Sequence, residues 1–297
     1  MVKKPFRPLL AGKTNLSKLH FPLYASPKID GIRCLIIDGK PVSRALKPIP
    51  NLFVQRTLQE LKLPFFDGEL VIGDPTTANV FNETTRGIMS IAGEPAFNYY
   101  FFDLISEEPY IERWKQALNA KALADIFNVN SLRIIPCYQT LITSLEQLPN
   151  YELKTLILGY EGIMLRSLEG LYKQGRSTTN EGILLKLKRF EDEEATVIGF
   201  QELLLNCNPE TVDALGYRKR SSQKEGLLAG HILGSLIVDS PKFGVFNIGT
   251  GFTDKQRYDI WYNRQAYEGR AVTFKYQPHG TLNKPRLPVF KGFREDL

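Results

Sequence analysis

Residues 26–33 read Ser26-Pro27-Lys28-Ile29-Asp30-Gly31-Ile32-Arg33 and lie between two apolar, strand-like runs at 23–25 and 32–37. An Asp-Gly pair in this position indicates a tight turn, because Gly31 tolerates backbone angles that other residues avoid. We therefore expect Lys28 at the edge of a sheet, with the arginine that ends the stretch nearby. A lysine becomes a nucleophile when burial or neighbouring cations lower the pKa of its ammonium. For this short motif alone, the alternative is a solvated lysine beside a hairpin turn.

Other ionisable residues also lie in or beside apolar runs, where a charge is costly unless it is paired or binds a ligand. For one of them, Glu69, the solvated face of an edge strand is an equally good interpretation. Strands of one sheet system would bring these side chains to Lys28 in a single cleft. Two carboxylates among several cations suit a nucleotide with bound Mg²⁺, because the acids can hold the metal and the lysines can neutralise phosphate charge. The residues are Glu69 in the run 65–72, Glu161 at the start of the run 161–166, and Lys186 and Lys188 in and just after the run 183–187.

The composition is that of a globular chain with an excess of positive charge. Its 297 residues can bury a large core and fit two domains better than one. The 38 Lys and Arg residues against 32 Asp and Glu residues give a formal net charge of +6, which favours a polyanionic partner. No apolar run approaches the roughly 20 residues of a membrane span, and the N-terminus lacks the apolar core of a secretory signal. We expect no membrane partner, and a monomer, since no pattern marks a self-association surface.

The three cysteines, Cys34, Cys137 and Cys207, are widely spaced and contain no Cys-x-x-Cys pair. Two of them lie in apolar, strand-like runs, so buried, reduced thiols are expected. The three histidines show no metal-ligand spacing and are interpreted as structural. The predicted location is a reducing intracellular compartment, the cytoplasm of a bacterium or of a virus-infected host.

Hydrophobic periodicity predicts alternating helices and strands up to about residue 189. A hairpin over 32–43 is expected to turn at Asp38-Gly39, and Asn51 is placed to cap a helix over 52–61. The aromatic strand 98–105 is typical of core packing, so stacking of one of its rings on a ligand base is the minority interpretation. Further helices are predicted over 78–89, 110–127 and 145–158.

The composition changes after Phe190, where Glu191-Asp192-Glu193-Glu194 forms a short acidic run. We place an interdomain hinge in this run, which is equally consistent with a solvated loop. Five short strands and one helix in about a hundred residues match a small OB-type barrel. The strands are predicted over 195–204, 231–238, 243–248, 271–277 and 286–290, and the helix over 254–267.

The connection between the first two of these strands, residues 205–229, is unusually long. Between Gly216 and Lys224 it contains four basic residues and no acid. Long loops in compact domains tend to be functional or disordered, and this one suits a flexible arm that orders on a phosphate backbone. The basic residues are Arg218, Lys219, Arg220 and Lys224.

Taken in order, these motifs resemble those of the ATP-dependent DNA ligases, most of all the compact type of Chlorella virus and of phages. The resemblance runs from about residue 20 to the end of the chain. Each motif is short, but six in the family's order are specific. The six segments are Lys28–Arg33, Ser43-Arg44, Asp67–Leu70, Tyr100–Asp103, Glu161–Arg166 and Leu185–Lys188. In addition, Gly249–Phe252 and Pro288–Arg294 resemble the family's C-terminal domain, and residues 216–224 resemble the latch with which the viral enzymes encircle DNA.

The resemblance implies an α+β fold whose first part, 1–189, is a nucleotidyltransferase domain of packed antiparallel sheets with helices. An OB-fold β-barrel would follow over 190–297, with a latch-like basic insertion at about 205–229. The implied reaction is the ATP-dependent sealing of 3′-hydroxyl/5′-phosphate nicks in duplex DNA, with Mg²⁺ or Mn²⁺ as cofactor. AMP would be carried first on Lys28 and then on the 5′-phosphate of the nick. Such transfers rest mainly on positioning and electrostatics.

The resemblance also implies a role for each matched side chain. Phe102 would stack on adenine, Arg44 would hold the 5′-phosphate, and Arg294 would orient pyrophosphate. The implied catalytic residues are Lys28, Arg33, Lys186 and Lys188, and the implied metal ligands are Glu69 and Glu161. The implied nucleotide-binding residues are Ser26, Pro27, Ile29, Arg33, Arg44, Glu69, Phe102, Glu161, Lys186, Lys188 and Arg294. The implied DNA-binding residues are Arg44, Lys47, Arg218, Lys219, Arg220 and Lys224.

The chain departs from the family pattern at its end, because the last motif usually has a further basic residue where Arg294 is followed by Glu-Asp-Leu. Lys291 is a candidate substitute. No extra N-terminal DNA-binding domain is expected, so encirclement of the duplex would depend on the basic loop. The rival interpretations are an mRNA-capping guanylyltransferase or an RNA ligase, which share the lysyl-nucleotide chemistry, and a non-catalytic binder that kept the fold. The latch-like loop and Gly249–Phe252 favour the DNA ligase.

Overall fold

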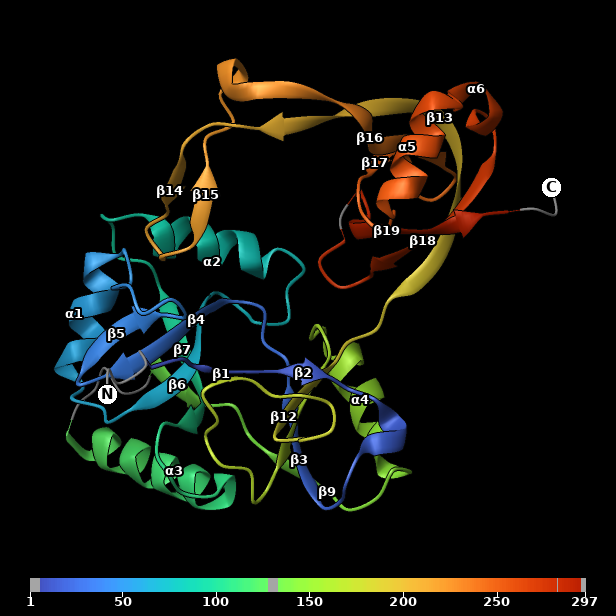
Figure 1. The fold of residues 1–297 in the computed structure, drawn as a ribbon. Helices are drawn as coiled ribbons and strands as arrows, with labels where there is room; N and C mark the ends of the chain where they lie inside the picture. The colour runs from blue at the N-terminus through green and yellow to red at the C-terminus, as the bar shows by residue number, and fades with distance from the viewer. Residues whose placement is uncertain (1–5, 128–132, 282, 295–297) are drawn as a thin grey trace, which may run out of the picture. The chain divides into compact units, whose positions relative to one another are not determined.

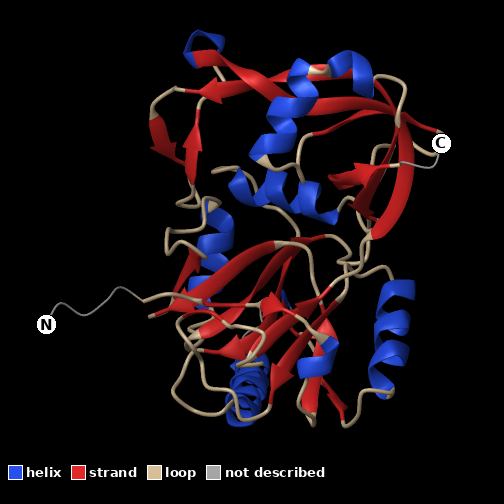
Figure 2. Cartoon of the chain, turned by 45° about the vertical axis from the view of Figure 1, so that its right-hand side comes forward, coloured by secondary structure: helices blue, strands red, loops and turns tan. Residues whose placement is uncertain are grey.

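The computed structural model describes residues 6–127, 133–281 and 283–294 (Figure 1). The chain folds into two compact units with separate hydrophobic cores. Unit 1 comprises Met1–Lys188 and Val212–Tyr217, and unit 2 comprises Arg189–Thr211 and Arg218–Leu297. Each unit combines strands with helices (Figure 2), and the predicted α+β class is confirmed. Within the described ranges, no helix combines the length and apolar character needed to cross a membrane.

Two five-stranded, mostly antiparallel sheets form the framework of unit 1. The first has the strand order β5-β4-β6-β7-β8 and the second the order β2-β12-β10-β3-β9, while β1 and β11 form a short parallel pair. The strands of the first sheet are β4 (Ile32–Ile37), β5 (Lys40–Ser43), β6 (Phe66–Ile72), β7 (Phe97–Leu104) and β8 (Ile134–Pro136). The other strands are β1 (Leu9–Leu10), β2 (Gly12–Lys13), β3 (Leu23–Pro27), β9 (Thr140–Ile142), β10 (Ile163–Ser167), β11 (Gly175–Arg176) and β12 (Leu184–Leu187).

The helices of unit 1 pack their apolar sides on these sheets. Helix α1 begins after Asn51, whose side chain accepts a hydrogen bond from the backbone N–H of Val54 at 2.9 Å, as the predicted cap requires. Buried residues of α1, α2 and α3, among them Trp114, share one core with the first sheet, whereas Leu148 of α4 packs with the second sheet. The helices are α1 (Leu52–Glu60), α2 (Val80–Met89), α3 (Tyr110–Phe127) and α4 (Gln147–Ile157).

Unit 2 contains the five predicted strands, paired antiparallel in the order β17-β16-β13-β18-β19. A bridge between Thr250 and Val289 joins the segment after β17 to β19, so the two edges of the sheet meet, as closure into a barrel requires. The helix predicted over 254–267 is divided at Asn263. The elements are β13 (Glu191–Asn206), β16 (Leu227–Ser240), β17 (Gly244–Ile248), α5 (Asp254–Tyr262), α6 (Arg264–Tyr267), β18 (Ala271–Gln277) and β19 (Arg286–Phe293).

The acidic run Glu191–Glu194 is not the solvated hinge loop that its composition predicts. It forms the first part of β13 and pairs with β18, with Glu194 opposite Thr273. Four consecutive acids are tolerated because successive side chains of a strand point to opposite faces, and each carboxylate here has a cationic or hydroxyl partner. The boundary between the units falls between Lys188 and Arg189.

Residues 205–229, called the basic hairpin below, are partly strand where the sequence predicts a long loop, and the predicted ordering on a phosphate backbone stays a prediction. The ladder between β13 and β16 continues into this segment, with Asn206 opposite Leu227. Beyond it, β14 (Glu210–Val212) is hydrogen-bonded to β15 (Arg218–Arg220). Every residue of β14 and β15 is exposed, so these strands carry no alternation of apolar and polar residues that a prediction could use.

Two exposed ion pairs lie within the basic hairpin. The carboxylate of Glu210 lies 3.4 Å from a guanidinium nitrogen of Arg218 and 3.7 Å from one of Arg220. At the base of the hairpin, the backbone N–H of Cys207 donates to Gly226 O at 2.8 Å. Cys207 is exposed, whereas the other two cysteines are buried as predicted.

Candidate active site

A pocket of about 250 Å³ opens in unit 1 beside Lys28. Most of the residues that line it are predicted site residues, brought together from both sheets. They are Ser26, Pro27, Lys28, Ile29, Arg33, Arg44, Glu69, Phe102 and Lys186. The rest of the lining is Leu10, Ala11, Met164, Arg166, Arg176 and Leu184.

Strand pairing fixes the backbone around Lys28. Strand β3 pairs with β10 up to Pro27, and the backbone N–H of Lys28 then donates to Gly162 O at 2.8 Å. Gly31 does not have the positive φ that an Asp-Gly turn predicts. It is required for space instead, because a Cβ at this position would lie 2.2 Å from Leu70 O. The turn therefore depends on close approach of β6 rather than on unusual backbone angles.

Lys28 forms an ion pair with Glu161, which also pairs with Lys188. The side chain of Glu161 is 3% exposed, and Nζ of Lys188 lies 3.0 Å from its Oε1. Burial alone would raise the pKa of Glu161, but the charges and hydrogen bonds of Lys28 and Lys188 outweigh burial and lower this pKa to about 2. Glu161 therefore stays ionised at neutral pH and compensates the positive charge around Lys28.

Lys186 adds a further cation to this cluster. It lines the pocket from β12, one residue before the end of the strand. Burial and the charges of Lys188, Lys28 and Arg176 lower the pKa of Lys186. A cation that is destabilised by its neighbours gains when an anion binds beside it. The pocket therefore favours an anionic ligand.

Glu69 lines the pocket and does not occupy the solvated face of an edge strand. It lies opposite Arg33 in the β4–β6 ladder, yet among the described residues no cation forms an ion pair with its carboxylate. Burial raises the pKa of Glu69 to about 7, although the charges of Arg33 and Lys28 oppose this rise. Near neutral pH, Glu69 therefore offers an unpaired carboxylate to a metal ion or a hydroxyl donor.

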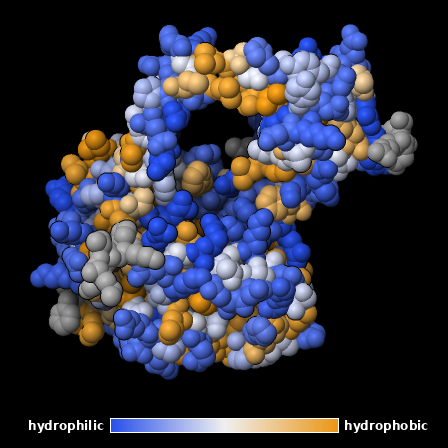
Figure 3. Space-filling view, viewed as in Figure 1, coloured by the Kyte–Doolittle hydropathy of each residue, from blue (hydrophilic) through white to orange (hydrophobic). Residues whose placement is uncertain are grey.

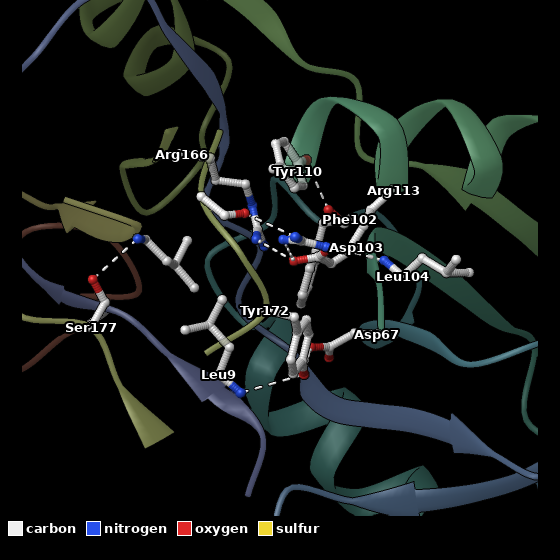
Figure 4. Close-up of polar contacts among 12 residues, drawn as sticks. Leu9, Asp67, Phe102, Asp103, Leu104, Tyr110, Arg113, Arg166, Tyr172 and Ser177 are labelled. Atoms are coloured by element: carbon white, nitrogen blue, oxygen red, sulfur yellow. Dashed lines mark hydrogen bonds and ion pairs between the residues drawn. The ribbon is translucent and has the colours of Figure 1, made fainter. Parts of the chain in front are cut away.

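The guanidinium of Arg33 is held by the wall of the pocket. Its Nε and Nη2 each lie 2.5 Å from a carboxylate oxygen of Asp67, and Nη2 also donates to Leu9 O at 3.1 Å. Tyr172 donates from its hydroxyl to the same carboxylate at 2.6 Å (Figure 4). The guanidinium carbon of Arg33 lies 4.9 Å from the centre of the Phe102 ring. Arg33 thus supports the aromatic ring, and its predicted catalytic role stays a prediction.

Phe102 is followed by Asp103, the centre of a buried ion-pair network (Figure 4). Asp103 accepts hydrogen bonds from Arg113 Nε and from Arg166 Nη1, both at 2.7 Å, and all three side chains are at most 3% exposed. The guanidinium of Arg166 lies 5.2 Å from the centre of the Phe102 ring. Tyr110 donates from its hydroxyl to Phe102 O at 2.9 Å. The ring of Phe102 is therefore positioned by two arginines, and its backbone is fixed from α3.

Two cationic side chains of the pocket, those of Arg166 and Arg176, are not among the predicted site residues. For Arg166 the available signal is an arginine ending the apolar run 161–166, on a strand that pairs with β12 on one side and β3 on the other. Within the described part of the chain, its Nε is buried without a hydrogen-bond partner. Arg176 lies in a polar segment on the two-residue strand β11, and no sequence pattern marks it.

Arg44 lines both the pocket and a neighbouring hollow of about 350 Å³. Its guanidinium carbon lies 5.0 Å from the ring centre of Tyr217, and the preceding Ser43 donates from its hydroxyl to Leu215 O at 2.6 Å. Leu215 is buried in the core of unit 1. Residues 212–217 of the basic hairpin therefore form part of the surroundings of Arg44. The hollow is lined by Arg7, Pro8, Leu10, Arg44, Ala45, Gly175, Arg176 and Tyr217.

The predicted DNA-binding residues outside the pocket are exposed. Lys47 packs beside Gly216, where an added Cβ would lie 2.5 Å from Lys47 Cγ. Arg218, Lys219 and Arg220 form β15, and Lys224 begins a 3₁₀ helix. The ribbon formed by the end of β13 and the start of β16 carries an apolar patch in Figure 3, to which the exposed side chains of Leu204, Leu205 and Leu228 contribute.

Arg294, predicted to bind the nucleotide, lies in unit 2 just after β19. Its guanidinium pairs with Glu194, and Lys291 pairs with Asp192 at 2.5 Å. The two cations of the last motif are therefore occupied by the acidic run of β13.

The metal ligands remain a prediction. Among the described residues, no group of three or more His, Cys, Asp or Glu side chains is placed to hold an ion. Glu69 and Glu161 both interact electrostatically with Lys28, and Mg²⁺ usually combines one or two carboxylates with waters and substrate phosphates. The unpaired carboxylate of Glu69 fits such an ion. Glu161 would first have to release a lysine.

Comparison with known proteins relates the chain to DNA ligases. Residues 226–294 match the family model of the DNA ligase OB-like domain. The crystal structure of Chlorella virus DNA ligase-adenylate is 37% identical to this chain, covering 98% of this chain and 99% of that one, with a TM-score of 0.56. No curated protein sequence matches the chain.

Solved structures with lower sequence identity to this chain share the fold. A structure from an analysis of Lig E DNA ligases is 24% identical, covers 98% of this chain and 100% of that one, and has a TM-score of 0.73. The ATP-dependent DNA ligase from bacteriophage T7 in complex with ATP is 16% identical, covers 97% and 98%, and has a TM-score of 0.53.

Proposed function

The chain belongs to the ATP-dependent DNA ligases of the compact viral and phage type, and we propose that it seals 3′-hydroxyl/5′-phosphate nicks in duplex DNA. One observation carries the proposal: Lys28 lies in a pocket with Lys186 and beside Glu161 and Lys188, a charge arrangement suited to the phosphates of a nucleotide. ATP would supply the energy, with AMP carried first by Lys28 and then by the 5′-phosphate of the nick.

In the first step, Nζ of Lys28 attacks the α-phosphorus of ATP and forms a phosphorus–nitrogen bond while the bond to pyrophosphate breaks. The attack needs a neutral amine, so the ion pair with Glu161 must open. The charge and hydrogen bond of Lys28 lower the pKa of Glu161, so the ion pair keeps the proton on Lys28, and that proton passes to solvent when the pair opens. Glu161 therefore positions Lys28, while Lys186 and Lys188 supply charge that stabilises the transferring phosphate.

In the second step, an oxygen of the nick's 5′-phosphate attacks the phosphorus of the lysine-bound AMP and displaces Lys28. The 3′-hydroxyl then attacks the activated 5′-phosphate, and AMP leaves. Arg44 is suited to hold the 5′-phosphate because it is exposed and lines both the pocket and the neighbouring hollow. Phe102, positioned by Arg33 and Arg166, supports the adenine ring. Mg²⁺ or Mn²⁺ held by Glu69 and Glu161 would neutralise phosphate charge.

The pKa of Glu69 predicts how the first step depends on pH. Below pH 7 this carboxyl is increasingly protonated and cannot hold a metal ion, so the second-order rate constant for adenylation should fall by about tenfold per pH unit beyond the fall that follows from the smaller amount of neutral amine. Glu69→Gln should be slower throughout, and its acidic limb should be less steep by this tenfold per pH unit. Single-turnover label transfer from α-labelled ATP, at subsaturating ATP and across about pH 5.5 to pH 8.5, measures both. An acidic limb that is equally steep in Glu69→Gln would assign this part of it to another group. Glu60→Gln, at an exposed position of α1, is the matched control.

The basic hairpin predicts strong salt sensitivity of nick binding. Arg218→Ala, Lys219→Ala and Arg220→Ala together should weaken binding and make the plot of log K against log salt shallower by about 1 for each lost phosphate contact. Fluorescence anisotropy with a labelled nicked duplex at several salt concentrations measures this slope. Glu210→Gln is the control, because it releases two arginines without removing a cation and should leave the slope unchanged. An unchanged slope in the triple variant would exclude contacts between these residues and phosphates.

Transfer of radiolabel tests the proposed function directly. The protein is incubated with α-labelled ATP or α-labelled GTP in Mg²⁺, and nicked DNA is then added. Label from ATP alone, discharged by nicked DNA as the strands are joined, is the expected result. Label from GTP, or discharge by an RNA nick in preference to a DNA nick, would favour a capping enzyme or an RNA ligase. Absence of label, in protein whose intact mass excludes prior adenylation, would contradict an enzymatic function.

A further inference from the structure

The acidic run of β13 divides its carboxylates between the two faces of the sheet, because side chains alternate along a strand. Asp192 and Glu194 share one face and reach across β18 to the cations of the last motif. Asp192 pairs with Lys291 at 2.5 Å, and Glu194 pairs with Arg294. Both acids lie opposite residues of β18 that in turn pair with β19, so the two ion pairs follow from the register of three strands.

The other two acids of the run have different partners. Glu191 accepts a hydrogen bond from the hydroxyl of Tyr276 at 2.5 Å, and both Glu191 and Glu193 lie 3.8 Å from Nζ of Lys242. These partners are not among the residues assigned to the nucleotide. Strand β13 therefore carries two pairs of carboxylates of equal charge. One pair neutralises Lys291 and Arg294, and the other pair lies beside Tyr276 and Lys242.

The ion pairs of Lys291 and Arg294 are open to solvent. The side chains of Lys291 and Asp192 are 45% and 53% exposed, and those of Arg294 and Glu194 are 39% and 47% exposed. Exposed ion pairs contribute little net stability, so such a pair exchanges readily when a better anion arrives. A triphosphate is a better anion, since it carries several charges and presents oxygens that an arginine can bind in a bidentate manner.

We propose that Asp192 and Glu194 are positioning residues that occupy Lys291 and Arg294 in the absence of ATP and release them to the triphosphate during adenylation. This inference rests on the proposed function, in which Arg294 orients the leaving pyrophosphate. The inference gives Asp192 and Glu194 a role in the first step, the adenylation of Lys28, and in no later step. The later steps involve no pyrophosphate, so they do not require the exchange.

The inference predicts a change in the ATP concentration that half-saturates adenylation, and no change in its limiting rate. Protein freed of AMP with pyrophosphate and Mg²⁺ is mixed with α-labelled ATP at constant ionic strength, and single-turnover rates are measured over a range of ATP concentrations. In Asp192→Asn/Glu194→Gln the half-saturating concentration should fall by about two- to fivefold, since exposed ion pairs compete only weakly. Joining of nicked DNA by pre-adenylated protein without ATP should be unaffected.

The matched control is Glu191→Gln/Glu193→Gln, which removes the same charge from the other face of the same strand. Its half-saturating ATP concentration should stay within the error of the wild type. An equal fall in both double variants would show general electrostatic attraction and overturn the inference. An unchanged or raised value in Asp192→Asn/Glu194→Gln would overturn it as well.

A third comparison tests whether Glu194 acts through Arg294. Arg294→Gln should raise the half-saturating ATP concentration, and adding Glu194→Gln to it should have no further effect. A further fall would mean that the carboxylate acts by another route and would overturn the inference. These outcomes differ from failure of the proposed function, in which the wild-type protein would take up no label from ATP at all.

Discussion

Replacing Lys28 by alanine is expected to lower transfer of AMP from ATP to the protein by at least about ten-thousandfold, because the attacking nitrogen is lost. Neither neighbouring lysine can substitute. Lys186 comes from β12 and Lys188 from just after it, so in Lys28→Ala neither amine takes the place of Nζ of Lys28, which follows β3. The measurement is single-turnover label transfer from α-labelled ATP, with separation of the protein under denaturing conditions.

Two comparisons make the test of Lys28 sharper. Lys28→Arg keeps a cation opposite Glu161 but lacks a nucleophilic amine, so it should fold normally and remain unlabelled. Joining of a nick that already carries AMP on its 5′-phosphate should persist in Lys28→Ala, since that step uses no bond to the lysine. Covalent labelling of Lys28→Ala would show that another residue carries the nucleotide.

Replacing Asp103 by alanine is expected to destabilise unit 1 by about 3–5 kcal/mol. The change leaves the guanidiniums of Arg113 and Arg166 buried without their shared carboxylate. Backbone carbonyls of Glu108 and Gly170 still accept from Arg113, but they cannot compensate its charge. Urea unfolding measures the loss of stability.

The two tryptophans allow unit 1 to be followed by itself. Trp114 is buried in the core of unit 1, whereas Trp261 belongs to unit 2, so a Trp261→Phe background reports on Trp114 alone. Glu112→Ala is the control, because its ion pair with Lys115 on α3 is exposed and should be worth less than about 1 kcal/mol. A loss below about 1 kcal/mol in Asp103→Ala would mean that the network is not needed for folding.

Local patterns in the sequence predict much of the fold. Helix α3 has the predicted bounds, and α1 ends one residue early, because their apolar residues recur at helical spacing and Asn51 caps the start of α1. The five strands of unit 2 are found where alternation predicts them, although β13, β16 and β19 are longer. The pocket also follows in large part from local signals, since Lys28, Glu69 and Lys186 are ionisable residues in apolar runs and all line it.

What the sequence does not predict depends on partners that are distant in the chain. Asp103 is unremarkable until β10 brings Arg166 to it, and the acidic run is a strand because β18 and β19 supply its partners. The strands of the basic hairpin are joined by backbone pairing, which leaves no hydrophobic pattern. The sequence predicts that Gly31 is needed for its backbone angles, and this reason is wrong. Glycine is needed because of crowding by Leu70 O, which arises only when β4 and β6 are paired.

The unequal burial of the three cysteines makes the unmodified chain suitable for site-specific fluorescent labelling. Burial raises the pKa of Cys34 and raises that of Cys137 to about 11, so both remain protonated and shielded, whereas alkylating dyes react with accessible thiolates. A maleimide dye would therefore react first at Cys207, at the base of the basic hairpin. The wild-type sequence thus already carries an attachment point from which movements of the hairpin can be watched in real time.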